Sequence, residues 1–340
     1  MSVYPIKYMS EQEQFMYTNW NTLPKQLKSE ETRWVAIDCN GYRWDLAGPL
    51  AGRQGVVFGE ELQGHLGIPF EHLLTESAYQ IGATYERTNI LKRIINAGIL
   101  IGAVGGRGRP LNAHQYRMVE SRWWSGWPIG QTGWLGSHTW LHGWRWIPVM
   151  WGEPLKNSQK KDATYAGNNC ASYDMQFLAV RPWYSKRVLI EPFTARTDGD
   201  SRTIAIANRG DMPQWYKALY SGPGQAWVQD GMLSDRQIEL PEITAKDGPV
   251  LCDTDEAART LTASSDPVDN EFYRLVRSAK ILDFFLHDIG ELGLPVWRRA
   301  SDVRFTSMIP PRTIANIKVK HSKAGGTVHV MMPQWFTRPY

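Results

Sequence analysis

The chain has 340 residues, of which 42% are apolar and 21% are charged, and its formal net charge is +4. This is the composition of a folded protein with room for two domains, so a wholly disordered chain is not expected. Lys and Arg are not gathered into a basic stretch, which argues against a dedicated nucleic-acid-binding protein.

The cysteine and tryptophan contents are also informative. Cys39, Cys170 and Cys252 are far apart and form no CxxC pair, so we expect reduced, mostly buried thiols and no zinc site. The 16 tryptophans outnumber the 10 phenylalanines. Tryptophan is enriched at protein interfaces, so this surplus favours a role in subunit contacts. Additional core packing and sugar-stacking surfaces are alternatives that the composition leaves open.

The first third of the chain predicts an N-terminal arm followed by strands. Residues 1–31 are polar and predict an arm that orders only against a partner. No apolar stretch is long enough for a signal peptide or a bilayer span, so we expect neither export nor membrane insertion. Asn40-Gly41 between two alternating segments predicts a hairpin of 34–38 and 42–46. Further strands are predicted at 56–58, 77–88 and 89–104.

One helix is predicted in this half. Asn112 can cap it, Tyr116, Val119 and Trp123 recur at helical spacing, and Gly126 ends it. Strands are then predicted within 133–146, 175–182 and 188–193. The polar, turn-rich segment 195–202 suggests a boundary between a first domain at 32–195 and a second at 196–340.

The second half predicts a β-sandwich, because short strands recur between turn signals. These strands are expected at 204–207, 216–220, 226–228, 237–240, 250–253, 314–319 and 327–331. Asp266-Pro267 begins a predicted long helix at 267–286. Its apolar stripe, which includes Phe272, Leu275 and Leu282, would pack on the protein's own core or, alternatively, dock a partner.

No catalytic, cofactor-binding or metal-binding motif is recognised. His138 and His142 lack the accompanying Glu of a zinc-peptidase helix, and Asp253 and Asp255 lack the remaining pattern of a calcium loop. Arg209-Gly210-Asp211 is interpreted as a turn or a chance tripeptide. We therefore expect that the protein is not an enzyme and needs no cofactor.

Several segments resemble phage tail proteins. WDLAGPLAG at 44–52 and FEHLLTESAYQIGATYERT at 70–88 resemble minor tail proteins of siphophages that infect mycobacteria and related actinobacteria. ANRGD at 207–211, YSGPG at 220–224, PVLCDTD at 249–255, RTLT at 259–262 and IPPRT at 309–313 are similar to segments of distal tail proteins. The resemblance extends over residues 32–340.

This resemblance implies a mainly β fold and a structural role. The first domain would be a tail-tube-like β-sandwich or split barrel with one helix, and the second a galectin-like β-sandwich into which helix 267–286 is inserted. Six copies would form a ring at the tail tip of the virion, assembled in the host cytoplasm. Its partners would be further copies of itself, the tail tube protein, the tail hub and other minor tail proteins, with the tape measure protein as a further candidate. DNA would pass through the lumen.

The ring hypothesis assigns roles to particular residues. Trp123, Trp124 and Trp127 would lie at subunit contacts, Arg87, Lys92 and Arg93 would face the lumen, and Phe272, Leu275 and Leu282 would dock a partner. The alternative function is a glycan-binding module that grips the host cell wall. A cell-wall hydrolase would need a carboxylate pair or metal site that the sequence does not present.

Overall fold

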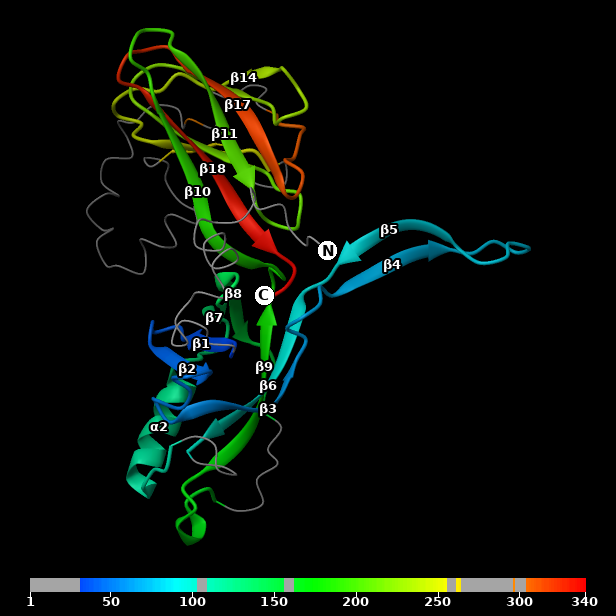
Figure 1. The fold of residues 1–340 in the computed structure, drawn as a ribbon, viewed down its shortest axis with the longest axis vertical. Helices are drawn as coiled ribbons and strands as arrows, with labels where there is room; N and C mark the ends of the chain where they lie inside the picture. The colour runs from blue at the N-terminus through cyan, green and yellow to red at the C-terminus, as the bar shows by residue number, and fades with distance from the viewer. Residues whose placement is uncertain (1–30, 103–108, 156–161, 256–260, 264–295, 297–303) are drawn as a thin grey trace, which may run out of the picture. The chain divides into compact units, whose positions relative to one another are not determined.

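The computed structural model describes residues 31–102, 109–155, 162–255, 261–263, 296 and 304–340. The predicted N-terminal arm, apart from Glu31, lies outside these residues, as does the predicted helix 267–286 with Phe272, Leu275 and Leu282. The described residues form two compact units (Figure 1). Among the described residues, the first unit contains 31–186 together with 336–340, and the second contains those within 187–335.

The division between the units differs from the predicted boundary at 195. It falls inside β10 (Tyr184–Thr194), because this strand continues from one unit into the other. The turn-rich segment that suggested the boundary instead connects β10 with β11 (Ser201–Asn208), within the second unit. The last five residues, 336–340, return to the first unit.

The first unit is built from two antiparallel sets of strands. One set has the order β10, β8 (Gly143–Trp151), β7 (Gly133–Thr139), β1 (Arg33–Ile37) and β2 (Arg43–Ala47). The other has the order β3 (Val56–Gln63), β6 (Arg93–Ile101) and β9 (Ala171–Ala179), and β9 also pairs with β8. The hairpin predicted at Asn40-Gly41 is confirmed as the antiparallel pair β1–β2, and a short 3-10 turn lies at Tyr165–Gly167.

Helix α2 (Ala113–Ser125) confirms the predicted helix, including its cap. The Asn112 side chain accepts from the backbone N–H of Gln115, whose side chain in turn accepts from the Asn112 N–H. This reciprocal pair satisfies donors that the first turn leaves free. At the other end, the Cys39 N–H donates to the Gly126 carbonyl at 2.9 Å, which fastens the β1–β2 turn to the end of the helix.

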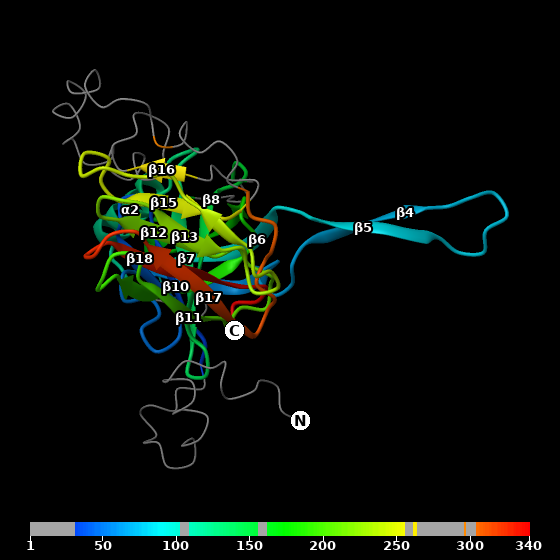
Figure 2. The ribbon, with the colours of Figure 1, turned by 90° about the horizontal axis from the view of Figure 1, so that it is seen from above.

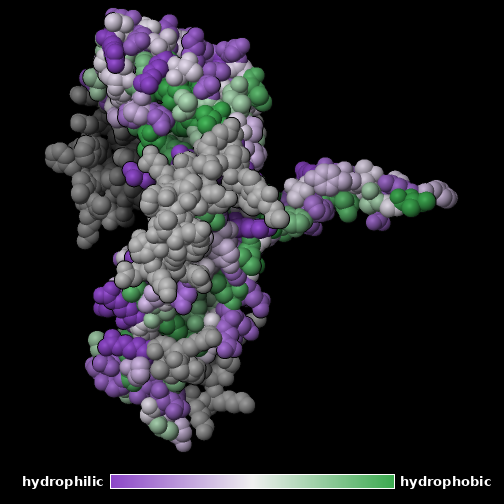
Figure 3. Space-filling model, in the orientation of Figure 1, coloured by the Kyte–Doolittle hydropathy of each residue, from purple (hydrophilic) through white to green (hydrophobic). Residues whose placement is uncertain are grey.

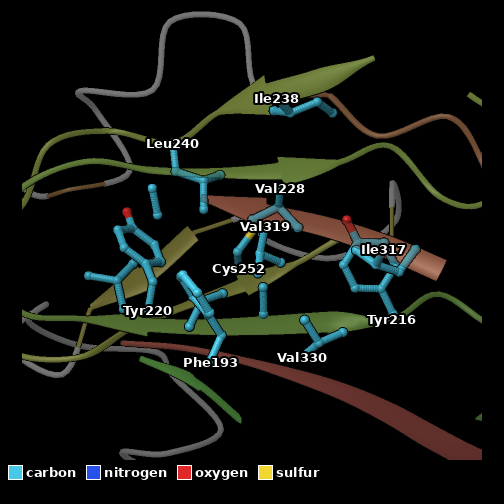
Figure 4. Close-up of a cluster of buried hydrophobic side chains, with 14 of the residues drawn as sticks. Phe193, Tyr216, Tyr220, Val228, Ile238, Leu240, Cys252, Ile317, Val319 and Val330 are labelled. Carbon is cyan, nitrogen blue, oxygen red and sulfur yellow. The ribbon is translucent and has the colours of Figure 1, made fainter. Parts of the chain in front are cut away.

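The second unit is a two-layer β-sandwich, as predicted. One layer has the order β16 (Leu261–Ala263), β15 (Val250–Asp253), β12 (Lys217–Ser221), β18 (Thr327–Phe336) and β10. The other has the order β11, β17 (Thr313–His321), β13 (Ala226–Gln229) and β14 (Gln237–Glu239). Figure 4 shows the side chains between the layers, which include Tyr216, Tyr220, Val228, Cys252, Ile317 and Val330.

A separate two-stranded sheet projects from the first unit. It consists of β4 (Phe70–Thr75) and β5 (Thr84–Ile90), paired antiparallel (Figures 1 and 2). The predicted strand 77–88 is therefore only partly correct, because 76–83 form the connecting loop and β4 was not predicted. Tyr79 and Ile81 alternate in sequence, but both are fully exposed, so their spacing did not reflect a buried sheet face.

Trp123 of α2 and Trp127 just after it belong to the core of the first unit, which corrects their predicted place at subunit contacts. Trp123 is 0% and Trp127 1% exposed, and the Trp123 ring lies 5.2 Å from that of Trp44. Trp124 is partly buried against Trp151 and Tyr173. Side chains enclosed by their own subunit cannot reach a neighbour, so core packing explains Trp123 and Trp127, whereas the place of Trp124 at a subunit contact stays a prediction.

The core position of Trp123 predicts a large effect on stability. We expect Trp123→Ala to lower the free energy of unfolding by about 3–5 kcal/mol, because the substitution removes a large apolar group and leaves a cavity. Urea denaturation of the purified chain measures this change. The control Ile129→Ala, at a side chain that is 88% exposed, should change it by less than about 0.5 kcal/mol. Unchanged stability in Trp123→Ala would show that the core assignment is wrong.

Candidate interaction surfaces

The projecting hairpin carries apolar side chains on one face. The strand register places Phe70 opposite Ile90, His72 opposite Thr88 and Leu74 opposite Tyr85. Paired residues share a face, so Phe70, His72, Leu74, Tyr85 and Ile90 form one stripe, called the hairpin stripe below. All residues from 70 to 92 are exposed, and Phe70 and Tyr85 are each 57% exposed. Figure 3 shows hydrophobic residues exposed along the hairpin.

Contacts within the stripe hold its side chains in place. The His72 ring lies 4.8 Å from that of Phe70 and 5.7 Å from that of Tyr85. The Thr88 hydroxyl lies 2.7 Å from the Tyr85 hydroxyl and 2.8 Å from Nδ1 of His72. The other face carries Glu71, Leu73, Thr75, Arg87 and Asn89, so the hairpin is two-sided.

A two-stranded hairpin with no further layer is marginally stable in water. Exposed apolar patches of this kind mark contact sites with other macromolecules. Nothing in the described part of the chain covers the stripe, since its residues remain exposed. The hairpin stripe is therefore the clearest candidate contact surface of the first unit. The hairpin stripe gives only a weak sequence signal, because Leu73 interrupts the alternation of Phe70, His72 and Leu74 with polar residues.

The base of the hairpin is anchored by Arg93, at the start of β6. Its Nε donates to the Pro182 carbonyl at 3.0 Å, and its Nη1 donates to the carbonyls of Gly64 and His65 at 3.1 and 2.8 Å. Its Nη2 donates to the Thr337 carbonyl at 2.8 Å. The predicted place of Arg93 in a lumen is thus wrong, because the residue is 0% exposed and its donors are directed at backbone carbonyls.

The buried positive charge of Arg93 is stabilised by the dipoles of the carbonyl groups around it. Burial lowers the pKa of the guanidinium, but an arginine remains protonated in proteins. Four carbonyl oxygens and the Tyr184 ring, whose centroid lies 5.1 Å from Cζ, offset the loss of water around the charge. Gly64 has φ +77°, and a Cβ there would collide with the Ile94 carbonyl. Only glycine allows the loop that leads to the hairpin to approach Arg93 so closely.

A second candidate surface lies on the outer face of the strands β1, β2, β7 and β8. The register places His138 opposite Trp144, Gly136 opposite Trp146 and Trp134 opposite Pro148. Trp134, His138, Trp144 and Trp146 therefore share one face and are called the indole platform below. Trp134 is 41% exposed, and the other three are partly exposed.

The platform is ordered by stacking. The rings of Trp144 and Trp146 are 5.1 Å apart at 19°, and the His138 ring lies 5.0 Å from that of Trp144. A Cβ at Gly136 would come within 2.5 Å of the Trp146 ring, so that indole lies flat on the backbone of β7. The missing side chain at 136 thus creates the site that Trp146 occupies.

Positive charge borders the platform. The guanidinium carbons of Arg33 and Arg43 lie 5.9 and 5.8 Å from the Trp144 ring centroid. Arg43 also pairs with Asp45 at 2.8 Å. Burial, with the nearby charge of Arg33, lowers the pKa of His138, which favours the neutral imidazole. The platform is thus an aromatic surface with cationic edges.

The other sequence-derived candidates have structural roles or remain untested. Lys217 pairs with Asp253 at 2.5 Å, and Asp253 accepts from the Asp255 N–H, as expected for a turn. Arg87 and Lys92 are exposed, and whether they face a lumen stays a prediction. In the described residues no group of three or more His, Cys, Asp or Glu is placed to hold a metal ion.

The thiols and the tripeptide also have simple explanations. Cys252 is buried, Cys39 and Cys170 are partly buried, and all three are free. Gly210 donates to the Asn208 side chain and Asp211 to the Trp335 carbonyl, so the tripeptide at 209–211 is a structural turn. Within the described ranges, no helix has both the length and the apolar character to cross a bilayer.

Comparison with solved structures identifies the fold. The crystal structure of the Dit protein of phage SPP1, described as a hub of the adsorption apparatus in phages that infect Gram-positive bacteria, matches with a TM-score of 0.51 and 8% identity. The match covers 89% of this chain and 98% of that chain. The chain has the fold of the SPP1 Dit protein. The mainly β fold class expected from the sequence is therefore confirmed.

Two structures of the phage P2 baseplate in its activated conformation also match. The structure with Ca has a TM-score of 0.46 and 10% identity, and covers 89% of this chain and 98% of that chain. The structure with Sr has a TM-score of 0.45 and 9% identity, and covers 88% and 97%. No protein-family model and no curated protein sequence matches the chain.

The Arg93 contacts predict that this residue stabilises the first unit. We expect Arg93→Met to lower the free energy of unfolding by about 2–4 kcal/mol, because four carbonyls lose a donor worth about 1 kcal/mol each. Urea denaturation measures the loss, and limited proteolysis near residues 64–65 should become faster. In the control Arg43→Met, whose side chain is 49% exposed, the loss should stay below about 1 kcal/mol. Equal losses in both variants would contradict the anchoring role.

Proposed function

We propose that this protein is a structural component of a bacteriophage tail tip. In this proposal six copies form a ring that joins the tail tube protein to the hub and fibre proteins, and its lumen lets DNA pass. The protein carries out no catalysis. The phage would infect mycobacteria or related actinobacteria, as the sequence resemblance implies.

The observation that carries the proposal is the unpartnered hairpin stripe in a chain with the SPP1 Dit fold. A hairpin whose residues 70–92 are all exposed, and whose base is fixed by a buried arginine, is suited to reach another subunit. The structural match covers 89% of this chain and 98% of the SPP1 Dit protein. It therefore includes both units and is not limited to a single β-sandwich domain of a widespread kind.

The proposed mechanism is geometric. A projecting element that contacts a different surface on the next copy makes a head-to-tail interface, and such interfaces close into rings when the rotation between copies is suitable. Closure would cover the stripe on every copy, so no apolar hairpin would remain in water. The exposed side chains of Arg87 and Lys92 are the candidates for contact with the DNA backbone in the lumen.

Ring formation is testable with the purified full chain. We expect mass photometry to give particles of six times 38.8 kDa, and negative-stain images to show rings with an open centre. The variant Leu74→Ser/Tyr85→Ser should shift the mass to that of one chain, because it removes apolar contacts without touching either core. The control Leu233→Ser, at an exposed site in the second unit, should leave the ring intact. A wild-type chain that stays monomeric at every concentration would refute the proposal.

A second candidate function, binding of a host cell-wall glycan, has one supporting observation. Trp227 of β13 is partly exposed on the outer face of its sheet, with the Lys320 ammonium 4.8 Å from the ring centroid. Glu239, opposite Trp227, accepts from the Gln225 side chain. An accessible indole among polar side chains is a surface on which a sugar can stack.

The glycan candidate makes its own prediction. The wild-type chain should sediment with purified cell walls of mycobacteria, and Trp227→Ala should sediment at least about 10-fold less, in line with the loss of an aromatic contact of about 1.4 kcal/mol. The control Val180→Ala, at an exposed site of the first unit outside both candidate contact surfaces, should sediment like the wild type. Absence of sedimentation for the wild type would remove this candidate and leave the ring proposal as it stands.

A further inference from the structure

We propose that the hairpin stripe of one copy lies across the indole platform of the next copy. This inference rests on the proposed ring and names the surface that accepts the hairpin. The stripe comprises Phe70, His72, Leu74, Tyr85 and Ile90, and the platform comprises Trp134, His138, Trp144 and Trp146.

The two surfaces match in chemistry. The stripe presents two aromatic and two aliphatic side chains, each between 43% and 57% exposed, around His72. The platform presents indoles, of which Trp134 is 41% exposed. Aromatic rings pack favourably on one another edge-to-face or offset, and Trp and Tyr are enriched at protein interfaces for this reason.

Both surfaces are preorganised. The stripe rings are fixed by contacts with one another and with the Thr88 hydroxyl, and Trp144 is stacked on Trp146 over the bare backbone of Gly136. Ordered side chains lose less conformational entropy when they associate. The sheets that carry the two surfaces are also fixed, the hairpin by Arg93 and the platform by β-pairing on both sides of β7.

The contact requires a second copy. The stripe and the platform belong to the same unit, yet both remain exposed in the single chain, so neither covers the other. Figures 1 and 2 show the hairpin extending away from the rest of its unit. Because the two patches differ, the contact between copies is head-to-tail and can repeat around a ring.

The hairpin as a whole and the edge of the platform have opposite net charge, with Glu71 and Arg87 on the face of the hairpin opposite the stripe. Residues 70–90 contain Glu71, Glu76 and Glu86 against Arg87, which gives a net charge of −2 from three negative charges and one positive charge. The platform is bordered by Arg33 and Arg43 against Asp45, which gives +1. Opposite net charges on the two approaching elements favour their encounter.

Photo-crosslinking in the assembled full chain tests the contact. Copies with p-benzoylphenylalanine in place of Tyr85 are mixed with isotopically heavy wild-type copies, irradiated and digested. We expect crosslinks from the stripe to heavy peptides that contain Trp134, Trp144 or Trp146. The control places the same crosslinker at Val180, which is 62% exposed and belongs to neither surface, and should yield no crosslink to these peptides.

A substitution on the acceptor side provides the second readout. Trp134→Ser should raise the dissociation constant of the assembly about 10–100-fold, as expected for an aromatic residue central to an interface. Ile129→Ser, which removes an exposed apolar side chain of the same unit that is not part of the platform, should change this dissociation constant less than about 2-fold.

The outcomes separate this inference from the proposed function. Rings whose stripe crosslinks to the platform support both. Rings whose stripe crosslinks to any other surface overturn the platform as acceptor and leave the ring proposal intact. A chain that never assembles overturns both, and assembly that Trp134→Ser and Ile129→Ser affect equally overturns the platform alone.

Discussion

The first unit depends on one buried arginine. Four hydrogen bonds from Arg93 reach carbonyls in three separate stretches of chain: the loop at 64–65, residue 182 between β9 and β10, and the C-terminal residues that begin at 336. A fully buried guanidinium cannot be left without acceptors, so these stretches are held at fixed distances from β6. The loop at 64–65 leads directly into the hairpin, and residue 337 belongs to the tail that returns from the second unit. The same side chain therefore fixes the position of the loop that leads into the hairpin and the position of the C-terminal residues.

The C-terminal residues are held by the same kind of contact. The Arg145 guanidinium donates to the Arg338 carbonyl at 3.0 Å and lies 4.0 Å from the Phe336 ring centroid, while the Ser137 hydroxyl donates to the Pro339 carbonyl at 2.6 Å. Side chains from β6, β7 and β8 thus recognise the backbone of the tail at consecutive residues. The inner face of these strands is occupied by the protein's own chain, which leaves the outer face with its indoles for other molecules.

Tryptophan has two separate uses in this unit. On the inner face, Trp44, Trp123 and Trp127 fill the core between α2 and the strands, and the Trp44 indole N–H reaches the Asp38 carboxylate at 3.0 Å. On the outer face, Trp134 is exposed, and Trp144 and Trp146 are partly exposed and stack on each other. The surplus of tryptophan in the composition is therefore not explained by one role. A rigid core and a rigid aromatic surface lie on opposite faces of one sheet, and alternation along β7 and β8 separates them.

The sequence by itself determined the elements that depend on residues close together in the chain: the helix capped by Asn112, the hairpin at Asn40-Gly41 and the short strands of the second unit. It also showed that no catalytic motif is recognisable. It also suggested the fold through its resemblance to distal tail proteins, and the fold was confirmed. Only the tertiary structure decided which face each aromatic residue occupies, because the positions of Trp123 and Trp134 relative to a core depend on strands far away in the chain. It likewise turned Arg93 from an expected lumen residue into a buried anchor, since its acceptors come from residues 64, 65, 182 and 337. The projecting hairpin β4–β5 could not be predicted for a related reason. A sequence reveals a strand by alternating apolar and polar residues, and this alternation arises because one face of the strand packs on a core. The hairpin covers no core within its own chain, so its alternation is incomplete.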